Sequence, residues 1–261
     1  MTPYDGRHPL LTIVTVCRNE ASRIQRTMDA ILGQSDQAFE WIVVDGASTD
    51  GTLDLLRRGQ PTLSRLISEP DQGLYDAMNK GIRAAHGEYI LFLNAGDRLE
   101  NPDVVRLFRE KSFNADIVVG DMLVLFPDGR EQLRKSTENP LDRDLLYWRS
   151  FPHPATFIKR SLFEKWGLYD LSFQITADRE FFVRAVVRHG AACVPWNHCV
   201  SIFTNDGISA SLENRKRLYR ERQRIHRMHY PARYRWRRDF NEAWGGIIHR
   251  IRQRINAHPE L

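Results

Sequence analysis

Three apolar runs in the first hundred residues each end abruptly in polar side chains. They cover residues 10–16, 38–44 and 89–93. Runs of this length, bounded by glycine or by polar residues, are typical of buried strands in a parallel sheet. Isoleucine, leucine and methionine recur with helical spacing after the first run, and leucines recur after the second. We therefore predict strand–turn–helix units that repeat about every thirty residues, which is the size of a βαβ unit.

The polar residues that follow these runs are the first candidates for function. In open α/β sheets, ligands bind just beyond the carboxyl ends of the parallel strands. We therefore expect the three polar turns to meet at one edge of the sheet and to build one ligand site. The side chains concerned are Asn19 and Glu20, Asp45 and Ser48, and Asn94 and Asp97.

A fourth polar group lies on a segment with helical spacing, residues 71–80. Its entering loop, Asp71 to Gly73, ends in a flexible glycine. Asp76, Asn79 and Lys80 are the polar positions of this segment that we consider for ligand binding. Asp76 and Lys80 are four residues apart, so a plain surface ion pair is the alternative.

Four segments in this order resemble the family 2 glycosyltransferases of the GT-A fold: VTVCRNEASRI, IVVDGASTDGT, SEPDQGLYDAMNKGI and GEYILFLNAGD. More narrowly, they are similar to the bacterial branch that builds exopolysaccharide and O-antigen. The resemblance covers roughly residues 9–210. It implies an α/β, Rossmann-like, mostly parallel sheet flanked by helices. We expect one GT-A domain over residues 1–210, with a nucleotide-sugar half (9–120) and an acceptor half (121–210). A basic helical C-terminal extension (211–261) should follow it.

The resemblance implies a nucleotide-sugar donor of the UDP or dTDP type. Asp45 is then expected to hydrogen-bond the base or ribose, and Lys80 to face phosphate or base. For Glu20 the alternative is an acidic residue favoured at a helix N-terminus. The residues we expect to contact the donor are Thr15, Asn19, Glu20, Asp45, Ser48, Asp76, Asn79, Lys80, Asn94 and His153.

A divalent metal, Mg²⁺ or Mn²⁺, is the expected cofactor, because it neutralises the leaving diphosphate. The family commonly shows Asp-x-Asp-Asp after the third strand. Here Asn94 and Gly96 occupy the first and third places, so Asp97 is the expected protein ligand. This departure leaves the need for metal open, and Asp97 could instead cap the next helix. His198 is a second, more distant candidate ligand.

The acceptor half should supply the base that takes the proton of the acceptor hydroxyl in an inverting transfer. By resemblance to the HPATF and ADRE segments, Asp178 is the expected base and Glu180 the second candidate. Simple capping of the following helix is the alternative for Asp178. His153, between two prolines, is expected to hydrogen-bond a hydroxyl or the diphosphate, or else to be structural. Gly207 is the expected hinge of a closing loop.

Composition favours a cytoplasmic enzyme. Hydrophobic residues make up 42% of the 261 residues, which is enough for a sizeable core. The sequence contains no apolar stretch of about eighteen residues, so we expect no transmembrane helix. The first ten residues lack the features of a secretory signal. Three cysteines are too few and odd in number for a disulfide framework. The spacing of Cys193, His198 and Cys199 does not match a zinc site, and residues 191–200 are expected to form a strand pair around Pro195.

The net charge of +5 hides a basic C-terminal segment, residues 213–254, which carries +10. Its aromatic residues alternate with arginines, but no nucleic-acid-binding motif accompanies them, so we expect no nucleic-acid partner. Residues 244–255 carry one apolar helical stripe flanked by arginines, which predicts a helix that lies on an anionic membrane. Packing on the catalytic domain or on a second subunit, in a homo-oligomer, is the alternative. The prediction is a peripheral protein of the inner face of the cell membrane, beside a polyprenyl-linked or saccharide acceptor.

Two other classes of protein are alternatives. A sugar nucleotidyltransferase would also use a sugar nucleotide, but it usually has a glycine-rich loop after the first strand. The segment VTVCRNEASRI contains no glycine. A degenerate transferase that binds a nucleotide without turnover is the other alternative, because carboxylates are missing at Asn94 and Gly96.

Overall fold

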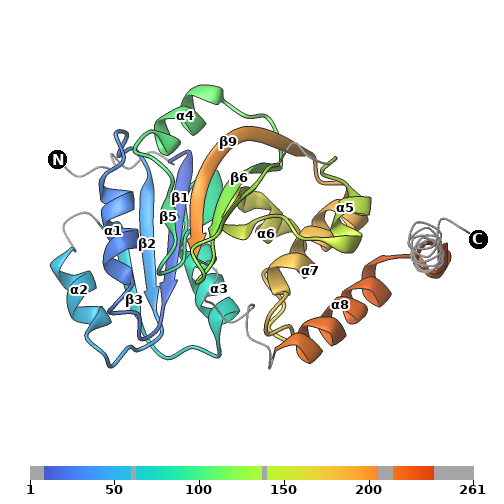
Figure 1. The fold of residues 1–261 in the computed structure, drawn as a ribbon, viewed down its shortest axis with the longest axis horizontal. Helices are drawn as coiled ribbons and strands as arrows, with labels where there is room; N and C mark the ends of the chain where they lie inside the picture. The colour runs from blue at the N-terminus through green and yellow to red at the C-terminus, as the bar shows by residue number, and fades with distance from the viewer. Residues whose placement is uncertain (1–8, 60–62, 137–139, 205–213, 238–261) are drawn as a thin grey trace, which may run out of the picture.

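The computed structural model describes residues 9–59, 63–136, 140–204 and 214–237 (Figure 1). Within these residues, nine strands form one sheet in the order β3-β2-β1-β4-β8-β6-β9-β5, with β7 paired to β6. The strands are β1 (Leu11–Cys17), β2 (Glu40–Asp45), β3 (Arg65–Ser68), β4 (Tyr89–Phe92), β5 (Arg98–Leu99), β6 (Ile117–Leu125), β7 (Glu131–Arg134), β8 (Thr156–Lys159) and β9 (Cys193–Thr204).

The helices connect and cover these strands. They are α1 (Ile24–Leu32), α2 (Thr52–Arg58), α3 (Leu74–Ala84), α4 (Val104–Lys111), α5 (Arg143–Trp148), α6 (Arg160–Trp166), α7 (Ala177–Val183) and α8 (Arg215–His229), with short helical turns η2 (His153–Ala155) and η3 (Arg184–Arg188). No helix among the described residues is long and apolar enough to cross a membrane.

The first four strands of the path, β3, β2, β1 and β4, run parallel, as the repeating units predicted. Every residue of β1, β2 and β4 is buried. Successive residues of β1 point to opposite faces of the sheet, so Val14 and Val16 belong to one core cluster and Ile13 and Cys17 to the other. The predicted α/β sheet flanked by helices is confirmed.

The two cores assign the helices to the two faces. Ile24 and Met28 of α1, with Phe108 of α4, pack in the cluster that holds Ile13. Met78 of α3 and Phe181 of α7 pack in the cluster that holds Val14. The sheet is therefore a middle layer between helices, and α3 and α7 cover the same face of it (Figure 1).

The strand pair predicted around Pro195 is wrong, because β9 is one continuous strand from Cys193 to Thr204. It runs parallel to β6, and Pro195 pairs with Val119. On its other side β9 meets β5 only at Ser201 and Ile202. A proline is tolerated where no neighbouring strand requires its missing N–H.

The segment expected to be a separate extension begins with a helix that packs on the acceptor half. Ile225 of α8 is fully buried, and α8 contacts α7 and η3. The predicted amphipathic stripe in residues 244–255 and the loop with Gly207 lie outside the described residues.

Candidate active site

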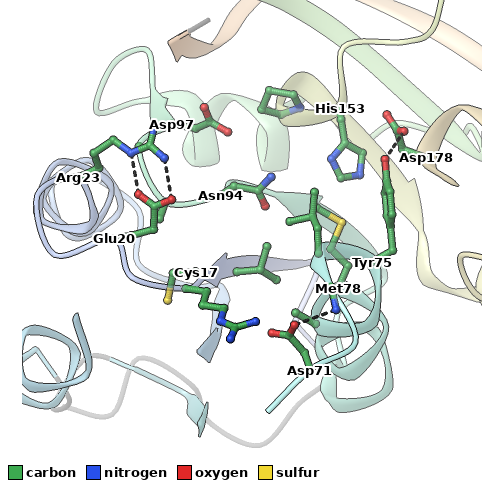
Figure 2. A pocket seen from close by; sticks show the side chains of 18 of the residues that line it. Cys17, Glu20, Arg23, Asp71, Tyr75, Met78, Asn94, Asp97, His153 and Asp178 are labelled. Atoms are coloured by element: carbon green, nitrogen blue, oxygen red, sulfur yellow. Dashed lines mark hydrogen bonds and ion pairs between the residues drawn. The ribbon is translucent and has the colours of Figure 1, made fainter. Parts of the chain in front are cut away.

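A cavity of about 530 Å³ opens at the carboxyl ends of β1 and β4 (Figure 2). In the sheet, β2 and β3 lie on one side of β1, and β4 lies on the other side. The strand order therefore reverses between β1 and β4. Such a point of reversal is where open α/β sheets bind ligands. The cavity is lined by residues from both halves of the chain: Val16–Arg18, Glu20, Arg23, Asp71, Gly73–Tyr75, Ala77, Met78, Asn94–Asp97, His153, Pro154, Gln174, Ile175, Asp178, Phe203 and Thr204.

Thr27 of α1 holds the turn that follows β4. Its hydroxyl donates to the backbone carbonyl of Asp97 at 2.7 Å and accepts from the N–H of Gly96 at 2.9 Å. Gly96 has a φ of +99°, a conformation that favours glycine. This turn places the side chains of Asn94 and Asp97 at the cavity, as Figure 2 shows.

The donor atoms at this turn suit Mg²⁺ or Mn²⁺, which prefer oxygen ligands. The Asn94 Oδ1 atom is buried and has no hydrogen-bond partner, and the Asp97 carboxylate lines the same cavity. In the described part of the chain, no three His, Cys, Asp or Glu residues are grouped to hold a metal. A metal at Asn94 and Asp97 would therefore take its other ligands from a diphosphate and water, as Mg²⁺ commonly does.

His198 does not join this turn. Its ring stacks on Trp196 with a centroid distance of 4.8 Å, and Trp196 packs against Phe108 and Phe157. His198 does not line the cavity. The structure thus places the second candidate ligand in an aromatic cluster on β9 and away from Asp97.

Glu20 and Arg23 form a second polar wall of the cavity. Two nitrogens of the Arg23 guanidinium each lie 2.6 Å from a carboxylate oxygen of Glu20. A Cβ atom added at Gly96 would lie 3.6 Å from the Arg23 side chain, so Arg23 lies beside the turn with Asp97. Glu20 was expected from the sequence and Arg23 was not, although a carboxylate and a guanidinium three residues apart, in the turn before α1, are a signal for such a pair. A guanidinium is well suited to bind a phosphate.

Asp45, Ser48 and Asn19 form a scaffold behind the cavity. Asp45 is fully buried and accepts hydrogen bonds from the hydroxyl of Ser68 at 2.7 Å and from the N–H of Ser48 at 3.1 Å. The Ser48 hydroxyl accepts in turn from the N–H of Asn19 at 2.8 Å. None of the three lines the cavity. Burial and the adjacent Asp45 raise the pKa of Cys17 far above its ordinary value, so this cavity-lining thiol stays protonated.

Thr15 and Asn79, two expected donor contacts, point into the core. The Thr15 hydroxyl accepts from the indole N–H of Trp41 at 3.1 Å, on the face of β1 opposite Val14. The Asn79 amide pairs with the backbone of Tyr169, at 2.9 Å to its carbonyl and 3.0 Å from its N–H. Asn79 therefore ties α3 to the acceptor half. Neither side chain lines the cavity, because both are held by groups within the fold.

Asp76 and Lys80 shape the loop that precedes α3. The Lys80 ammonium donates to the carbonyl of Pro70 at 2.6 Å and lies 3.0 Å from Glu69 and 3.8 Å from Asp76. The ion pair between Asp76 and Lys80, which was the alternative to ligand binding, is thus present. Neither Asp76 nor Lys80 lines the cavity.

Asp71 lines the cavity from this same loop, although the sequence indicated it only as part of a turn. Its carboxylate accepts from the N–H of Gly73 at 2.9 Å. A Cβ added at Gly46 would lie 2.2 Å from an Asp71 oxygen, so glycine at position 46 lets this carboxylate approach. The closeness of Asp71 to the end of β2 depends on the fold and leaves no sequence signal.

Asp178 and His153 face the cavity from the acceptor half (Figure 2). Asp178, in the first turn of α7, accepts a hydrogen bond from the Tyr75 phenol at 2.7 Å. The His153 Nε2 atom lies 2.9 Å from the hydroxyl of Tyr169, and the ring stacks on Phe92. Burial lowers the pKa of His153, so the imidazole is neutral at pH 7.

Glu180, the second candidate for the base, is away from the cavity and only 2% exposed. It lies 2.8 Å from the His229 ring and 3.0 Å from the Arg184 guanidinium. Burial acts to raise the pKa of Glu180, but these hydrogen bonds and charges lower it below its ordinary value. Glu180 is two positions after Asp178 on α7, which turns its side chain toward His229 of α8, so its contacts are structural.

Comparison with known proteins agrees with this fold. The model of glycosyl transferase family 2 matches residues 12–176. The PGL/p-HBAD biosynthesis glycosyltransferases of Mycobacterium tuberculosis and Mycobacterium bovis are 34% identical over 220 residues, which cover 81% of this chain and 84% of theirs. An uncharacterized glycosyltransferase of Mycobacterium tuberculosis is 35% identical over 183 residues, 69% of this chain and 70% of that protein.

Solved structures share the fold. Staphylococcus aureus TarS 1–349 in complex with UDP has a TM-score of 0.63 and 18% identity, covering 74% of this chain and 60% of that chain. The mannosyltransferase PcManGT from Pyrobaculum calidifontis, in complex with GDP-Man and Mn²⁺, has a TM-score of 0.58 and 22% identity, covering 84% of this chain and 61% of that chain. This chain thus spans about three fifths of the length of these solved chains.

The fold and the site define a glycosyltransferase of the GT-A class. The chain belongs to glycosyl transferase family 2.

Proposed function

We propose that this chain is an inverting glycosyltransferase that moves a sugar from a UDP- or dTDP-type donor to a lipid-linked or saccharide acceptor in cell-surface polysaccharide synthesis. One observation carries the proposal. A single cavity has Asn94 and Asp97 on one wall and Asp178 on another. The relatives named for PGL/p-HBAD biosynthesis and the TarS complexes with UDP and UDP-GlcNAc support it.

The donor diphosphate is proposed to bind at the turn after β4. A divalent metal held there by Asp97 and Asn94 would neutralise the charge that develops on the leaving diphosphate. Arg23 lies beside the same turn, where its guanidinium is paired with the Glu20 carboxylate. Asp71 is proposed to accept a hydrogen bond from the nucleobase, because its carboxylate lines the cavity whereas that of Asp45 is buried behind it. The role proposed for Asp45 is then to hold the loop after β2.

The acceptor is proposed to bind between Asp178 and the donor sugar. Its hydroxyl oxygen forms the new bond at the anomeric carbon, and its proton passes to Asp178. The acceptor oxygen attacks the face of the anomeric carbon opposite the diphosphate, so the anomeric configuration inverts. The electron pair of the broken bond goes to the diphosphate oxygen. The neutral His153 ring is proposed to hydrogen-bond a hydroxyl of the bound sugar. The Tyr75 ring, which lines the cavity and contacts Asp178, helps to keep bulk water from the base.

Two measurements test this function. A thermal-shift screen of sugar nucleotides, with and without Mn²⁺, should identify the donor. Asp178→Asn should then keep the affinity for UDP and lose turnover by about 10²-fold or more, as expected for the loss of a general base. Asp54→Asn, on the exposed face of α2, is the matched control and should retain turnover. Near-normal turnover of Asp178→Asn would remove Asp178 from the mechanism.

A second function is favoured by one specific feature. The amide of Asn94 and the backbone of Gly96 occupy places where the family commonly has carboxylates. A degenerate transferase would bind UDP at the cavity without turning over any sugar nucleotide. The enzyme should release UDP from a sugar nucleotide and lose this activity in Asp178→Asn. The degenerate transferase should release no UDP.

Association with the membrane is proposed through the C-terminal segment, from the cytoplasmic face. Within the described residues, α8 adds a basic outer face with exposed side chains at Arg215, Lys216, Arg217, Tyr219, Arg220, Arg227 and Met228. An anionic lipid surface attracts such a face. Flotation with anionic liposomes should occur at low salt and weaken at high salt.

A chain ending at Arg237 is the appropriate comparison, because it keeps α8 and removes the apolar stripe of residues 244–255. Equal flotation of the two chains would rule out the stripe as the anchor. Sedimentation of the same two chains tests the alternative that the stripe joins two subunits.

A further inference from the structure

The loop that leads into α7 is held by a side chain from the C-terminal helix α8. Glu221 is 8% exposed, and its carboxylate faces the loop backbone. It accepts from the N–H of Gln174 at 2.9 Å, of Ile175 at 3.1 Å and of Thr176 at 3.0 Å. The Thr176 hydroxyl also donates to it, at 2.8 Å. A carboxylate that gathers successive N–H groups before a helix is stabilised by these dipoles and fixes their geometry.

The same loop forms the acceptor wall of the cavity. Gln174, Ile175 and Asp178 all line the cavity. On the side opposite Glu221, the Tyr75 phenol lies 2.8 Å from the carbonyl of Ile175 and 2.7 Å from Asp178. The short segment that carries Asp178 is therefore held between a carboxylate of α8 and a phenol of α3.

Thr176 does not cap α7 with its own side chain. Its hydroxyl is directed to Glu221, so the start of α7 depends on a residue forty-five positions further along the chain. A charge-assisted hydrogen bond is roughly twice as strong as a neutral one. Removing the Glu221 charge should therefore loosen the loop even where the rest of α8 stays in place.

Other contacts of α8 keep Glu221 in position. Ile225 is fully buried, and the His226 ring stacks on Tyr147 with a centroid distance of 4.0 Å. His229 lies 2.8 Å from Glu180, and Arg222 donates to the carbonyl of Trp148 at 3.1 Å. Helix α8 is thus docked on the acceptor half at several points along its length.

We propose that Glu221 is a positioning residue for Asp178, so that α8 is part of the catalytic unit and not a separable basic tail. Glu221 touches no substrate. It acts through the backbone of residues 174–176, which sets where the Asp178 carboxylate lies. The inference rests on the proposed role of Asp178 as the base.

The test is the variant Glu221→Gln. Glutamine keeps the size of the side chain but offers one acceptor oxygen, and its NH₂ group faces N–H donors. Turnover, measured as UDP release from the donor found in the screen, should fall by at least ~10-fold, since a small displacement of a reacting group can cost about 10²-fold. The Michaelis constant for the donor and the affinity for UDP should stay within about twofold, because the donor wall is untouched. Amide exchange of the peptide 172–180 should become faster, with β1 and β2 unchanged.

Two controls separate positioning from stability. Ile225→Val weakens the packing of α8 without touching the loop, so it should lower the melting temperature and leave turnover unchanged. Glu164→Gln removes an exposed carboxylate far from the loop and should change neither. If Glu221→Gln has native turnover, or if Ile225→Val loses as much turnover as Glu221→Gln, the proposal is overturned.

A double-mutant cycle distinguishes this inference from the proposed function. If Glu221 acts through Asp178, adding Glu221→Gln to Asp178→Asn should cost less than about twofold more, because coupled residues are not additive. Full additivity of the two losses contradicts the positioning role and leaves the base in place. Native turnover of Asp178→Asn alone contradicts the proposed base itself.

Discussion

The phenol of Tyr75 lies 2.7 Å from the carboxylate of Asp178, a residue 103 positions further along the chain. Tyr75 belongs to α3 of the nucleotide half, and Asp178 belongs to α7 of the acceptor half. Burial and the adjacent Asp178 raise the pKa of Tyr75 well above its ordinary value. The phenol therefore stays protonated and donates a hydrogen bond to Asp178. The two halves of the enzyme therefore meet at the proposed base.

The first prediction concerns this contact. Tyr75→Phe should lower turnover by about 10-fold, because Asp178 loses the group that orients it. The free energy of unfolding should fall by about 1 kcal/mol, the typical net contribution of one hydrogen bond. Steady-state kinetics and urea unfolding measure both. Tyr219→Phe, at a side chain that is exposed, is the control. Unchanged turnover in Tyr75→Phe would show that Asp178 needs no such orientation.

The second prediction concerns the metal. Asp97→Ala should remove the gain in UDP affinity that Mn²⁺ gives, because Asn94 alone supplies too few protein oxygens. Turnover should be lost while the fold is kept. Calorimetry of UDP binding with and without Mn²⁺ measures the effect, and Asp54→Ala is the control for loss of one carboxylate. A variant that keeps the metal-dependent gain would exclude Asp97 as the ligand.

The third prediction separates Glu180 from catalysis. Glu180→Gln leaves His229 and Arg184 without their buried carboxylate, so the free energy of unfolding should fall by about 3 kcal/mol. UDP affinity should be kept at a temperature where the variant is folded. Asp178→Asn should show the opposite pattern, with little change in stability and a large loss of turnover. Loss of turnover in Glu180→Gln at native stability would return Glu180 to the mechanism.

The fourth prediction concerns pH. Burial lowers the pKa of His153 below the ordinary value of 6.5. The unfolded chain then binds a proton near pH 6.5 that the native state takes up only at lower pH. The stability that His153 contributes is therefore present above about pH 6.5 and is lost as the pH falls toward its lowered pKa.

The difference in melting temperature between the native chain and His153→Gln reports this linkage. It should shift in favour of the variant between about pH 7 and pH 5. His189→Gln, at an exposed ring, serves as the control for the other histidines. A His153 resonance that titrates at or above 6.5 in the free protein would contradict the prediction.

Local patterns were sufficient to predict the central strands. Residues 10–16 and 89–93 were predicted as strands. Strand β1 is shifted from the first range by one residue at both ends, and β4 ends one residue before the second range does. Helix α1 covers the residues whose apolar spacing indicated it. A buried strand needs apolar side chains on both faces and a buried helix face needs a regular stripe, so both leave a direct trace in the sequence. The polar turn with Asn94 and Asp97 was predicted because it directly follows the apolar run 89–93.

Side-chain direction at the site was decided by tertiary contacts. Thr15 lies near the end of the apolar strand β1 and Asn79 on α3, yet Trp41 and the Tyr169 backbone hold them inside the fold. Glu180 is two residues from Asp178 but pairs with His229, forty-nine positions away. Such contacts join residues that are far apart in the chain, and the residue types are the same whether the group faces substrate or core.

The sequence by itself therefore determined the family, the parallel core and the edge of the sheet where polar groups gather. Tertiary structure alone decided which of those groups reach the cavity, and it added Arg23 and Asp71. It also decided that the basic α8 docks on the acceptor half, because Glu221 and Ile225 look like ordinary members of a charged helix until their distant partners are known. Hydrophobic periodicity is a property of neighbouring residues, whereas a binding site is made by residues that only the completed fold brings together.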